Sequence, residues 1–184
     1  MHGPRPGTRE HRSLSEIRPT FRALFTDVFE THFARIFRYL DRMTGDPDLA
    51  ADLAQETFVR LYRRGSFPDS TEAWLISVAT NLLRNARSTA ARRRTLLAGA
   101  QPGIAQGAPP RSPETGPESE CTRRQVRAAL DRLPERERSL LLLRAEGYSY
   151  AELARALGLH EASVGTLLAR ARRTFEEQLP RGRQ

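Results

Sequence analysis

A run of twenty residues near the middle of the chain, GAQPGIAQGAPPRSPETGPE (99–118), is almost entirely Gly, Pro, Ala and polar side chains. Such a stretch has no apolar core of its own, and its prolines and glycines interrupt helices and strands. We therefore expect residues 98–120 to form a flexible linker. This linker divides the 184 residues into two parts of fewer than a hundred each, which predicts two small domains.

The first nineteen residues are rich in Gly, Pro, Arg and Ser, and we expect residues 1–19 to form a disordered extension. They contain no apolar signal core, and no apolar run in the chain approaches the roughly 20 residues that span a bilayer. The sequence therefore predicts a cytoplasmic protein without membrane insertion.

The regular parts of the chain, residues 20–97 and 121–184, both carry apolar side chains at steps of three and four residues, and no segment alternates like a strand. Helix starts are marked by Asp46-Pro47 and by Asp69 with Glu72, because aspartate caps free amides and proline suits the first helical position. The prediction is an all-α fold of two small helical domains.

The second domain contains a short helix that a capping box opens at Ser149, a turn centred on Gly158 and a second amphipathic helix. This order is typical of a helix-turn-helix, whose second helix enters the major groove of DNA. A plain three-helix protein-binding domain is the alternative. The residues expected to touch DNA here are Ser149, Tyr150, Ser163, Thr166, Arg170 and Arg173.

Charge supports a nucleic-acid partner. The formal net charge is +8, and every basic residue is an arginine, a side chain that binds phosphate and guanine edges with two hydrogen bonds. Arginines outnumber acids twelve to nine in residues 20–97 and thirteen to eight in residues 121–184. A basic chain favours a polyanion, with nucleic acid first and a membrane surface second.

Features that would predict chemistry are missing from the sequence. Cys121 is the only cysteine, so no internal disulfide is expected, and the four histidines are scattered, which argues against a metal site. Neither a nucleophile–base pair nor a Gly-rich phosphate loop is visible. We expect no enzymatic activity and no cofactor.

Several stretches in order resemble one known family, the bacterial RNA polymerase sigma factors of the short, two-domain extracytoplasmic-function (ECF) class. "DPDLAADLAQETFVRLYR" resembles the helix that docks on the clamp helices of core polymerase. "AWLISVATNLLRNARS" resembles the region that melts and reads the −10 promoter element. "LDRLPERERSLLLLRAEGYSYAELARALGL" and "SVGTLLARARRTF" resemble the region that reads the −35 element. The resemblance covers about residues 20–97 and 121–178.

The resemblance implies roles for individual residues. Core polymerase binding falls on Asp52, Leu53, Gln55, Glu56 and Phe58. Contact with the −10 element falls on Trp74, Ser77, Asn81, Arg84 and Arg87, with the loop 66–71 helping to capture an unstacked base. Each match has a plainer reading, in which Trp74 belongs to the core and the acidic residues form an ordinary solvated helix face.

The partners implied by the resemblance are core RNA polymerase, through its clamp helices and flap, promoter DNA and an anti-sigma factor. A stand-alone regulator of the LuxR type is the alternative, because residues 133–175 resemble its helix-turn-helix nearly as well. Such regulators usually carry a ligand-binding or α/β receiver domain, and no β/α alternation precedes residue 98.

The chain departs from the family pattern in its recognition helix. Gly165 and Leu167 stand where lysine and arginine are frequent, and His160 stands where a Ser or Thr cap is usual. We expect Leu167 to widen the core and Gly165 to leave a gap on the DNA side. Specificity for the −35 element would then depend on late arginines and on DNA shape.

Overall fold

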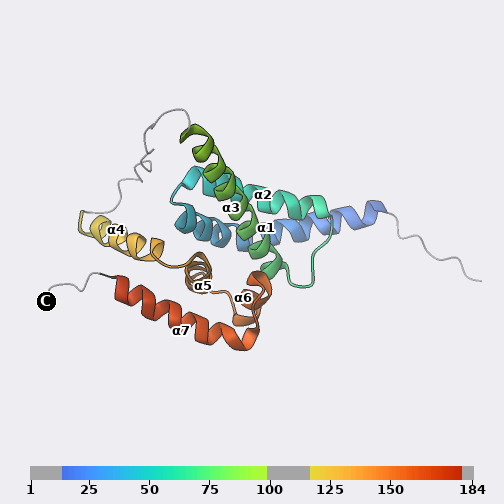
Figure 1. The fold of residues 1–184 in the computed structure, drawn as a ribbon. Coiled ribbons are helices and arrows are strands. Elements are labelled where there is room, and N and C mark those ends of the chain that lie inside the picture. The colour runs from blue at the N-terminus through green and yellow to red at the C-terminus, as the bar shows by residue number, and fades with distance from the viewer. Residues whose placement is uncertain (1–13, 99–116, 180–184) are drawn as a thin grey trace, which may run out of the picture.

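The computed structural model describes residues 14–98 and 117–179, in which every regular element is an α-helix. The all-α prediction is confirmed. The first module contains three helices (Figure 1): α1 (Leu14–Thr44), α2 (Pro47–Arg64) and α3 (Thr71–Ala98). The second contains four: α4 (Pro117–Asp131), α5 (Glu135–Ala145), α6 (Tyr150–Leu157) and α7 (Glu161–Gln178).

The expected disorder of the N-terminal extension and of the linker falls mostly on residues 1–13 and 99–116, which lie outside the described residues. Helix α1 begins at Leu14, so it includes residues that the sequence assigned to the extension. Helix α4 begins at Pro117, inside the expected linker, and proline is favourable at the start of a helix.

Local signals fix the ends of α2 and α6 as the sequence predicts, whereas α3 begins at Thr71, two residues after Asp69. Asp46 caps α2, since its Oδ1 accepts hydrogen bonds from the amides of Asp48 and Leu49 at 3.1 Å each, and Gly65 ends the helix at a left-handed φ of 71°. The capping box expected at the start of α6 is present, and Gly158 ends that helix at a φ of 61°.

Each module packs its helices around buried aliphatic and aromatic side chains. In the first module, Ile36 and Leu40 of α1 meet Phe58 and Leu61 of α2 and Leu75 of α3 in one buried cluster. In the second module, the predicted inner face of α7 is buried at Val164, Leu168 and Ala171 and half-buried at Phe175. These buried faces hold the helices in place, because most helical stability in proteins comes from the packing of an amphipathic face.

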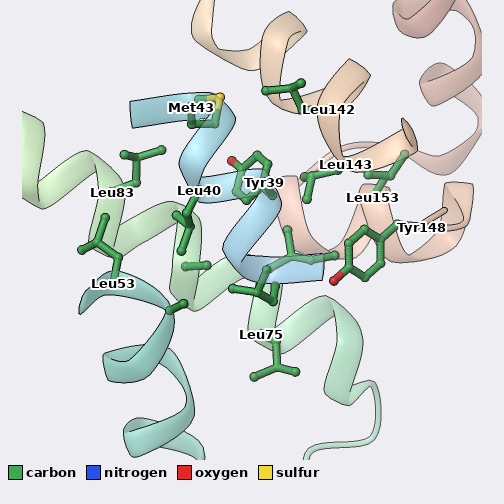
Figure 2. Packing of buried hydrophobic residues seen from close by; sticks show 14 of the residues in the cluster. Tyr39, Leu40, Met43, Leu53, Leu75, Leu83, Leu142, Leu143, Tyr148 and Leu153 are labelled. Carbon is green, nitrogen blue, oxygen red and sulfur yellow. The ribbon is translucent and has the colours of Figure 1, made fainter. Parts of the chain in front are cut away.

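The two modules also share a core, which the linker alone did not predict. Buried side chains of α1, among them Tyr39, Leu40 and Met43, belong to the same cluster as Leu143 of α5 and Leu153 of α6 (Figure 2). Helix α1 contacts α5, and α3 contacts α6. The modules are therefore docked against each other.

Candidate nucleic-acid interface

The polar stripe expected to read the −10 element lies on α3. Asn81 and Arg84 are exposed and Ser77 is half-buried, and the Oδ1 of Asn81 accepts a hydrogen bond from Nη1 of Arg84 at 3.3 Å. Trp74 is half-buried and packs against the core cluster, which favours the plainer of the two readings of this residue. The stripe thus offers one amide and one guanidinium as hydrogen-bonding groups for a base or phosphate.

This stripe faces the second module. Asn81 and Arg84 line a cleft of about 390 Å³ whose opposite wall is formed by α5 and α6, with Glu135, Arg136 and Leu157 among its residues. The cleft is partly open to solvent, and its lining combines charged side chains with the apolar residues Ala156 and Leu157.

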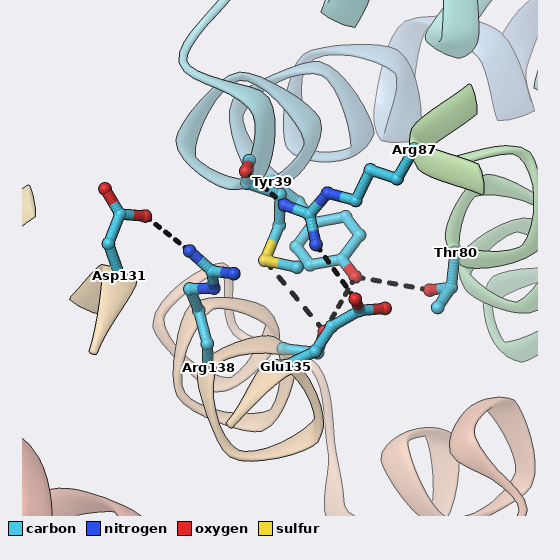
Figure 3. A network of polar contacts seen from close by, with 8 residues as sticks. Tyr39, Thr80, Arg87, Asp131, Glu135 and Arg138 are labelled. Atoms are coloured by element: carbon cyan, nitrogen blue, oxygen red, sulfur yellow. Dashed lines mark hydrogen bonds and ion pairs between the residues drawn. The ribbon is translucent and has the colours of Figure 1, made fainter. Parts of the chain in front are cut away.

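Arg87, the next basic residue on α3, is engaged by other groups of the protein. Its Nη1 donates to Oε2 of Glu135 in α5 at 3.0 Å, and its Nη2 donates to the backbone oxygen of Met43 at 2.6 Å (Figure 3). Beyond Arg87, the run Arg92, Arg93 and Arg94 is exposed on the last turns of α3. Among the described residues, this run has no ion pair with a carboxylate of the second module, unlike Arg87.

A buried hydroxyl network joins the modules beside Arg87. The phenol of Tyr39 donates to Oγ of Ser139 at 3.1 Å and lies 3.3 Å from Oγ1 of Thr80 (Figure 3). Burial raises the pKa of Tyr39, so the phenol stays neutral. The network connects α1, α3 and α5 and pairs polar groups that would be costly to bury alone.

The residues expected to bind polymerase divide into two groups on α2. Asp52 and Gln55 are exposed and Glu56 is half-buried, with Oε1 of Glu56 accepting from Nε of Arg60 at 2.9 Å. Leu53 and Phe58 are buried in the core. These two side chains therefore hold the helix in place, and a partner would meet the polar face.

The same face of α2 carries two exposed apolar residues that the sequence did not predict as part of a binding surface. Val59 and Tyr62 are exposed, Tyr62 by 53%. They follow Gln55 and Glu56 at steps of three and four residues, which places them on the same face of the helix. This spacing in the sequence could have predicted a surface with both polar and apolar side chains. The ring centres of Phe21 and Phe25 lie 6.0 and 5.2 Å from the ring centre of Tyr62, so these two residues extend the surface onto α1.

Helix α6 begins with Ser149, whose side chain is already in use. Its Oγ accepts from the amide of Glu152 at 3.3 Å and donates to Oε2 of Glu152 at 2.7 Å. Tyr150 is exposed, and the guanidinium of Arg144 lies 5.5 Å from the centre of its ring. The backbone amide of Ser149 also donates to Oε2 of Glu152, at 2.6 Å, so both its hydroxyl and its amide are engaged in the capping box, while Tyr150 presents its ring to solvent.

Helix α7 carries the other residues expected to contact the −35 element, and Ser163, Thr166 and Arg173 among them are exposed. Arg170 is exposed too, but its Nη2 donates to Oε1 of Glu137 in α5 at 2.5 Å, and that carboxylate side chain is only 9% exposed. Arg170 therefore has a structural partner within the module, and Arg173 is the arginine more fully available to DNA.

The expected gap beside Gly165 is not empty. A Cβ at this position would lie 3.6 Å from Cε2 of Tyr150, so the ring of Tyr150 borders the glycine. Leu167 is half-buried and packs against the core cluster, as expected. His160 precedes α7 without a side-chain cap hydrogen bond. The unusual residues of α7 thus alter the contact between α6 and α7 as well as the outer face.

Within residues 14–98 and 117–179, no three His, Cys, Asp or Glu side chains gather in a way that could hold a metal ion. In the same part of the chain, none of the helices has the length and apolar character needed to cross a membrane.

Family comparisons divide the chain where the modules divide. Residues 28–93 match the family model of sigma-70 region 2, and residues 123–175 match that of sigma-70 region 4. The first match covers most of α1–α3, and the second runs from α4 into α7.

Curated relatives carry the same assignment. The ECF RNA polymerase sigma factor SigL of Mycobacterium tuberculosis is 32% identical over 161 residues, covering 79% of this chain and 83% of SigL. The RNA polymerase sigma factor CarQ of Myxococcus xanthus is 31% identical, covering 83% and 86%. The ECF RNA polymerase sigma factor BldN of Streptomyces coelicolor is 30% identical over 85% of this chain, which spans only 60% of the length of BldN.

Two solved structures share the fold. The sigma factor RpoE of Bartonella quintana, in complex with the anti-sigma factor NepR, aligns with a TM-score of 0.64 at 19% identity over 86% of this chain and 98% of that one. CnrH, in complex with the cytosolic domain of CnrY, aligns with a TM-score of 0.60 at 19% identity over 89% and 92%.

Proposed function

The chain belongs to the ECF group of sigma-70 RNA polymerase sigma factors, and from this premise we propose that it directs bacterial core RNA polymerase to promoters. It would recognise the −35 and −10 elements and help to melt the DNA at the latter. The polymerase would carry out all covalent chemistry. The place of action would be the cytoplasm, where core polymerase and DNA are found.

One observation carries this proposal. Region 2 and region 4 matches occur together and in order in a single chain, on two helical modules. A stand-alone LuxR-type regulator would account for the helix-turn-helix but not for the match over residues 28–93. The family therefore favours a polymerase subunit over an independent DNA-binding regulator.

The division of work follows the surfaces of the two modules. The face of α2 with Asp52, Gln55 and Glu56 suits a basic partner helix pair, to which Val59 and Tyr62 add apolar contact. The α3 stripe around Asn81 would take the unstacked base of the −10 element. The loop 66–71, which leads into α3 at Thr71, would help to capture that base. Leu53 and Phe58 would support docking indirectly.

The second module would read the −35 element with α7 in the major groove. Ser163, Thr166 and Arg173 would reach base edges, with Tyr150 and the first amides of α6 against the backbone. An anti-sigma factor as a regulatory partner is part of the proposal, in view of the complex that RpoE of Bartonella quintana forms with NepR.

Reconstitution tests the proposal. The purified chain, mixed with bacterial core polymerase, is expected to co-elute with it and to give transcripts that start at defined promoters. Asp52→Arg should weaken co-elution because it places a cation on the acidic face. Glu30→Arg, the same charge reversal at an exposed position of α1, is the matched control and should co-elute normally.

Absence of both co-elution and promoter-dependent transcripts would overturn the proposal. Tight, sequence-specific binding of duplex DNA by the chain alone, together with no affinity for polymerase, would instead favour the stand-alone regulator.

A further inference from the structure

The outer face of α7 lies opposite the side that packs into the core. The buried side is formed at steps of four and three residues by Val164, Leu168 and Ala171. Two residues before each of these, a rotation of about 200° around the helix axis, the side chains are exposed: Ala162, Thr166 and Ala169. These three residues are the part of α7 that would meet base edges when the helix enters the major groove.

This part of α7 is short of free positive charge. Residues 161–171 contain a single basic side chain, Arg170. Its Nη2 donates to Oε1 of Glu137 at 2.5 Å, and the Glu137 side chain is only 9% exposed. Proteins most often recognise guanine by two hydrogen bonds from arginine or lysine to its O6 and N7 atoms. A guanidinium that is bound to a nearly buried carboxylate is less available for that contact.

The first turn of α7 adds an exposed acid, Glu161. An ionised carboxylate only accepts hydrogen bonds, and guanine presents two acceptors, O6 and N7, in the major groove. Acceptors that face each other repel. Glu161 and the engaged Arg170 therefore both disfavour guanine at the bases that the start of α7 would meet.

Thr166 is the exposed residue at the centre of this face, and its side chain is not used by the protein. Its hydroxyl has no hydrogen-bond partner among the described residues, whereas Oγ1 of Thr174, on the same helix, donates to the backbone oxygen of Arg170 at 3.1 Å. Beside Thr166, the ring of Tyr150 borders Gly165, where a Cβ would lie 3.6 Å from Cε2 of the ring. Thr166 thus offers a free methyl group next to an apolar ring surface.

Methyl groups on a protein suit one base above the others. Thymine carries a 5-methyl group on its major-groove edge, and alanine and threonine methyl groups make apolar contact with it. The α-helix rises about 5.4 Å per turn and DNA about 3.4 Å per base pair, so side chains one turn apart meet base pairs one or two steps apart. The outer face of α7 therefore matches A·T pairs in close succession.

We propose that Thr166 recognises the 5-methyl group of a thymine in the −35 element, and that Ala162 and Ala169 contact thymines to either side of it. The chain would then select a run of A·T pairs where a recognition helix with free arginines would select guanine. This inference rests on the proposed function, because it assigns base specificity to the helix that would lie in the groove.

Deoxyuridine tests the proposal on the DNA, since it differs from thymidine only by the missing 5-methyl group. Holoenzyme first selects promoters, by transcription, from a DNA library randomised upstream of the start site, and the selected fragments are the probes. Their −35 elements should contain adjacent A·T pairs. Replacing a contacted thymine by uracil should lower holoenzyme affinity about fourfold, the value of one buried methyl group. The same replacement between the two elements is the matched control and should have no effect.

Variants of Thr166 test the protein side of the same contact. Thr166→Ser removes the methyl group and keeps the hydroxyl, so it should bind thymine and uracil equally at one position. Thr166→Val keeps a methyl group and removes the hydroxyl, so it should retain the preference for thymine. Thr174→Ser is the matched control on the same helix and should also retain it. Circular dichroism verifies that the helices remain, and the uracil experiment on the unaltered chain does not depend on any variant.

Selected −35 elements without adjacent A·T pairs would overturn the proposal. Equal binding of thymine and uracil by the unaltered chain would overturn it too, and would indicate that α7 responds to the shape of the DNA. A thymine preference that persists in Thr166→Ser would remove the role of Thr166. All three outcomes need an active holoenzyme, so they are distinct from failure of the proposed function, in which no promoter is transcribed.

Discussion

The two surfaces expected to read DNA differ in what covers them. On the first module, the α3 stripe faces a cleft and Arg87 is bound by Glu135 of the other module. On the second module, α7 lies away from the first module, with Ser163 and Arg173 exposed (Figure 1). The difference teaches that domain docking can engage an arginine on one helix, such as Arg87, while a comparable arginine on another helix, such as Arg173, stays exposed.

The largest expected effect sharpens the assignment of the covered surface. Asn81→Ala should lower promoter opening about 100-fold, because a site built to hydrogen-bond a base loses its partner. Binding to core polymerase should change less than about twofold, since Asn81 lies on α3 and the residues proposed to meet the polymerase lie on α2. Opening is measured by permanganate reactivity of unpaired thymines, and binding by co-elution. Equal loss of both would contradict the assigned role.

Substitutions of Arg170 and Arg173 test the exposed surface of α7. Arg173→Ala should weaken −35 binding by roughly 1–3 kcal/mol when the residue contacts a guanine edge, with loss that depends on sequence. Arg170→Ala should also lower the thermal stability of the module, because it leaves the nearly buried Glu137 without its arginine. The loss of −35 binding is measured by titrating promoter fragments with holoenzyme, and the loss of stability is measured by thermal unfolding of the chain. A uniform, salt-dependent loss for Arg173→Ala would indicate a phosphate contact instead.

The module boundary contains two buried tyrosines with opposite expectations. Tyr39→Phe should lower the free energy of unfolding by about 1–2 kcal/mol, because it removes the bonds to Ser139 and Thr80. Tyr148→Phe should be neutral or stabilising by up to about 1 kcal/mol, because the buried hydroxyl has no hydrogen-bond partner among the described residues. Urea denaturation measures both. Equal destabilisation would show that the Tyr39 network adds nothing.

A smaller effect on stability is expected at Gly165, the glycine inside α7. Gly165→Ala should raise the free energy of unfolding by about 0.5–1 kcal/mol, because alanine favours the helix and its Cβ meets Tyr150 at an ordinary contact distance. Denaturant unfolding measures the gain. Destabilisation by more than about 1 kcal/mol would mean that the contact between α6 and α7 is tighter than its geometry indicates.

The smallest effect concerns pH. Burial lowers the pKa of His32, and the nearby charge of Arg35 lowers it further. The carboxylates of Glu72 and Glu152 raise this pKa, but their effect is smaller than the lowering. The unfolded chain therefore binds a proton more readily than the folded one, so the stability that this group contributes is present above about pH 6.5 and is lost as pH falls below it. His32→Gln should flatten the dependence of the melting temperature between pH 7.5 and 5.5. An unchanged slope would exclude His32 as its cause.

The sequence predicted what depends on neighbouring residues. The caps at Asp46 and Ser149, the ends at Gly65 and Gly158 and the helix-turn-helix follow from local spacing, and all are present in the structure. Local signals suffice here because a cap or a turn is decided by a few adjacent residues.

The docking of the two modules could not be predicted from local sequence signals. Arg38 and Glu146 are separated by 108 positions, and Tyr39 and Ser139 by 100, so no spacing rule connects them. The pairing of Arg170 with Glu137 and the position of Tyr150 beside Gly165 likewise depend on how helices cross. These contacts decide which candidate DNA residues are available in the closed protein.

Energy transfer between dyes at Cys121 and Arg63→Cys, recorded while core polymerase is added, tests the account most directly. The account predicts a high signal in the protein alone that falls, saturably, to a low value as holoenzyme forms, because both promoter elements must be reached at once. A chain that binds core polymerase and starts transcription while the signal stays high would contradict it.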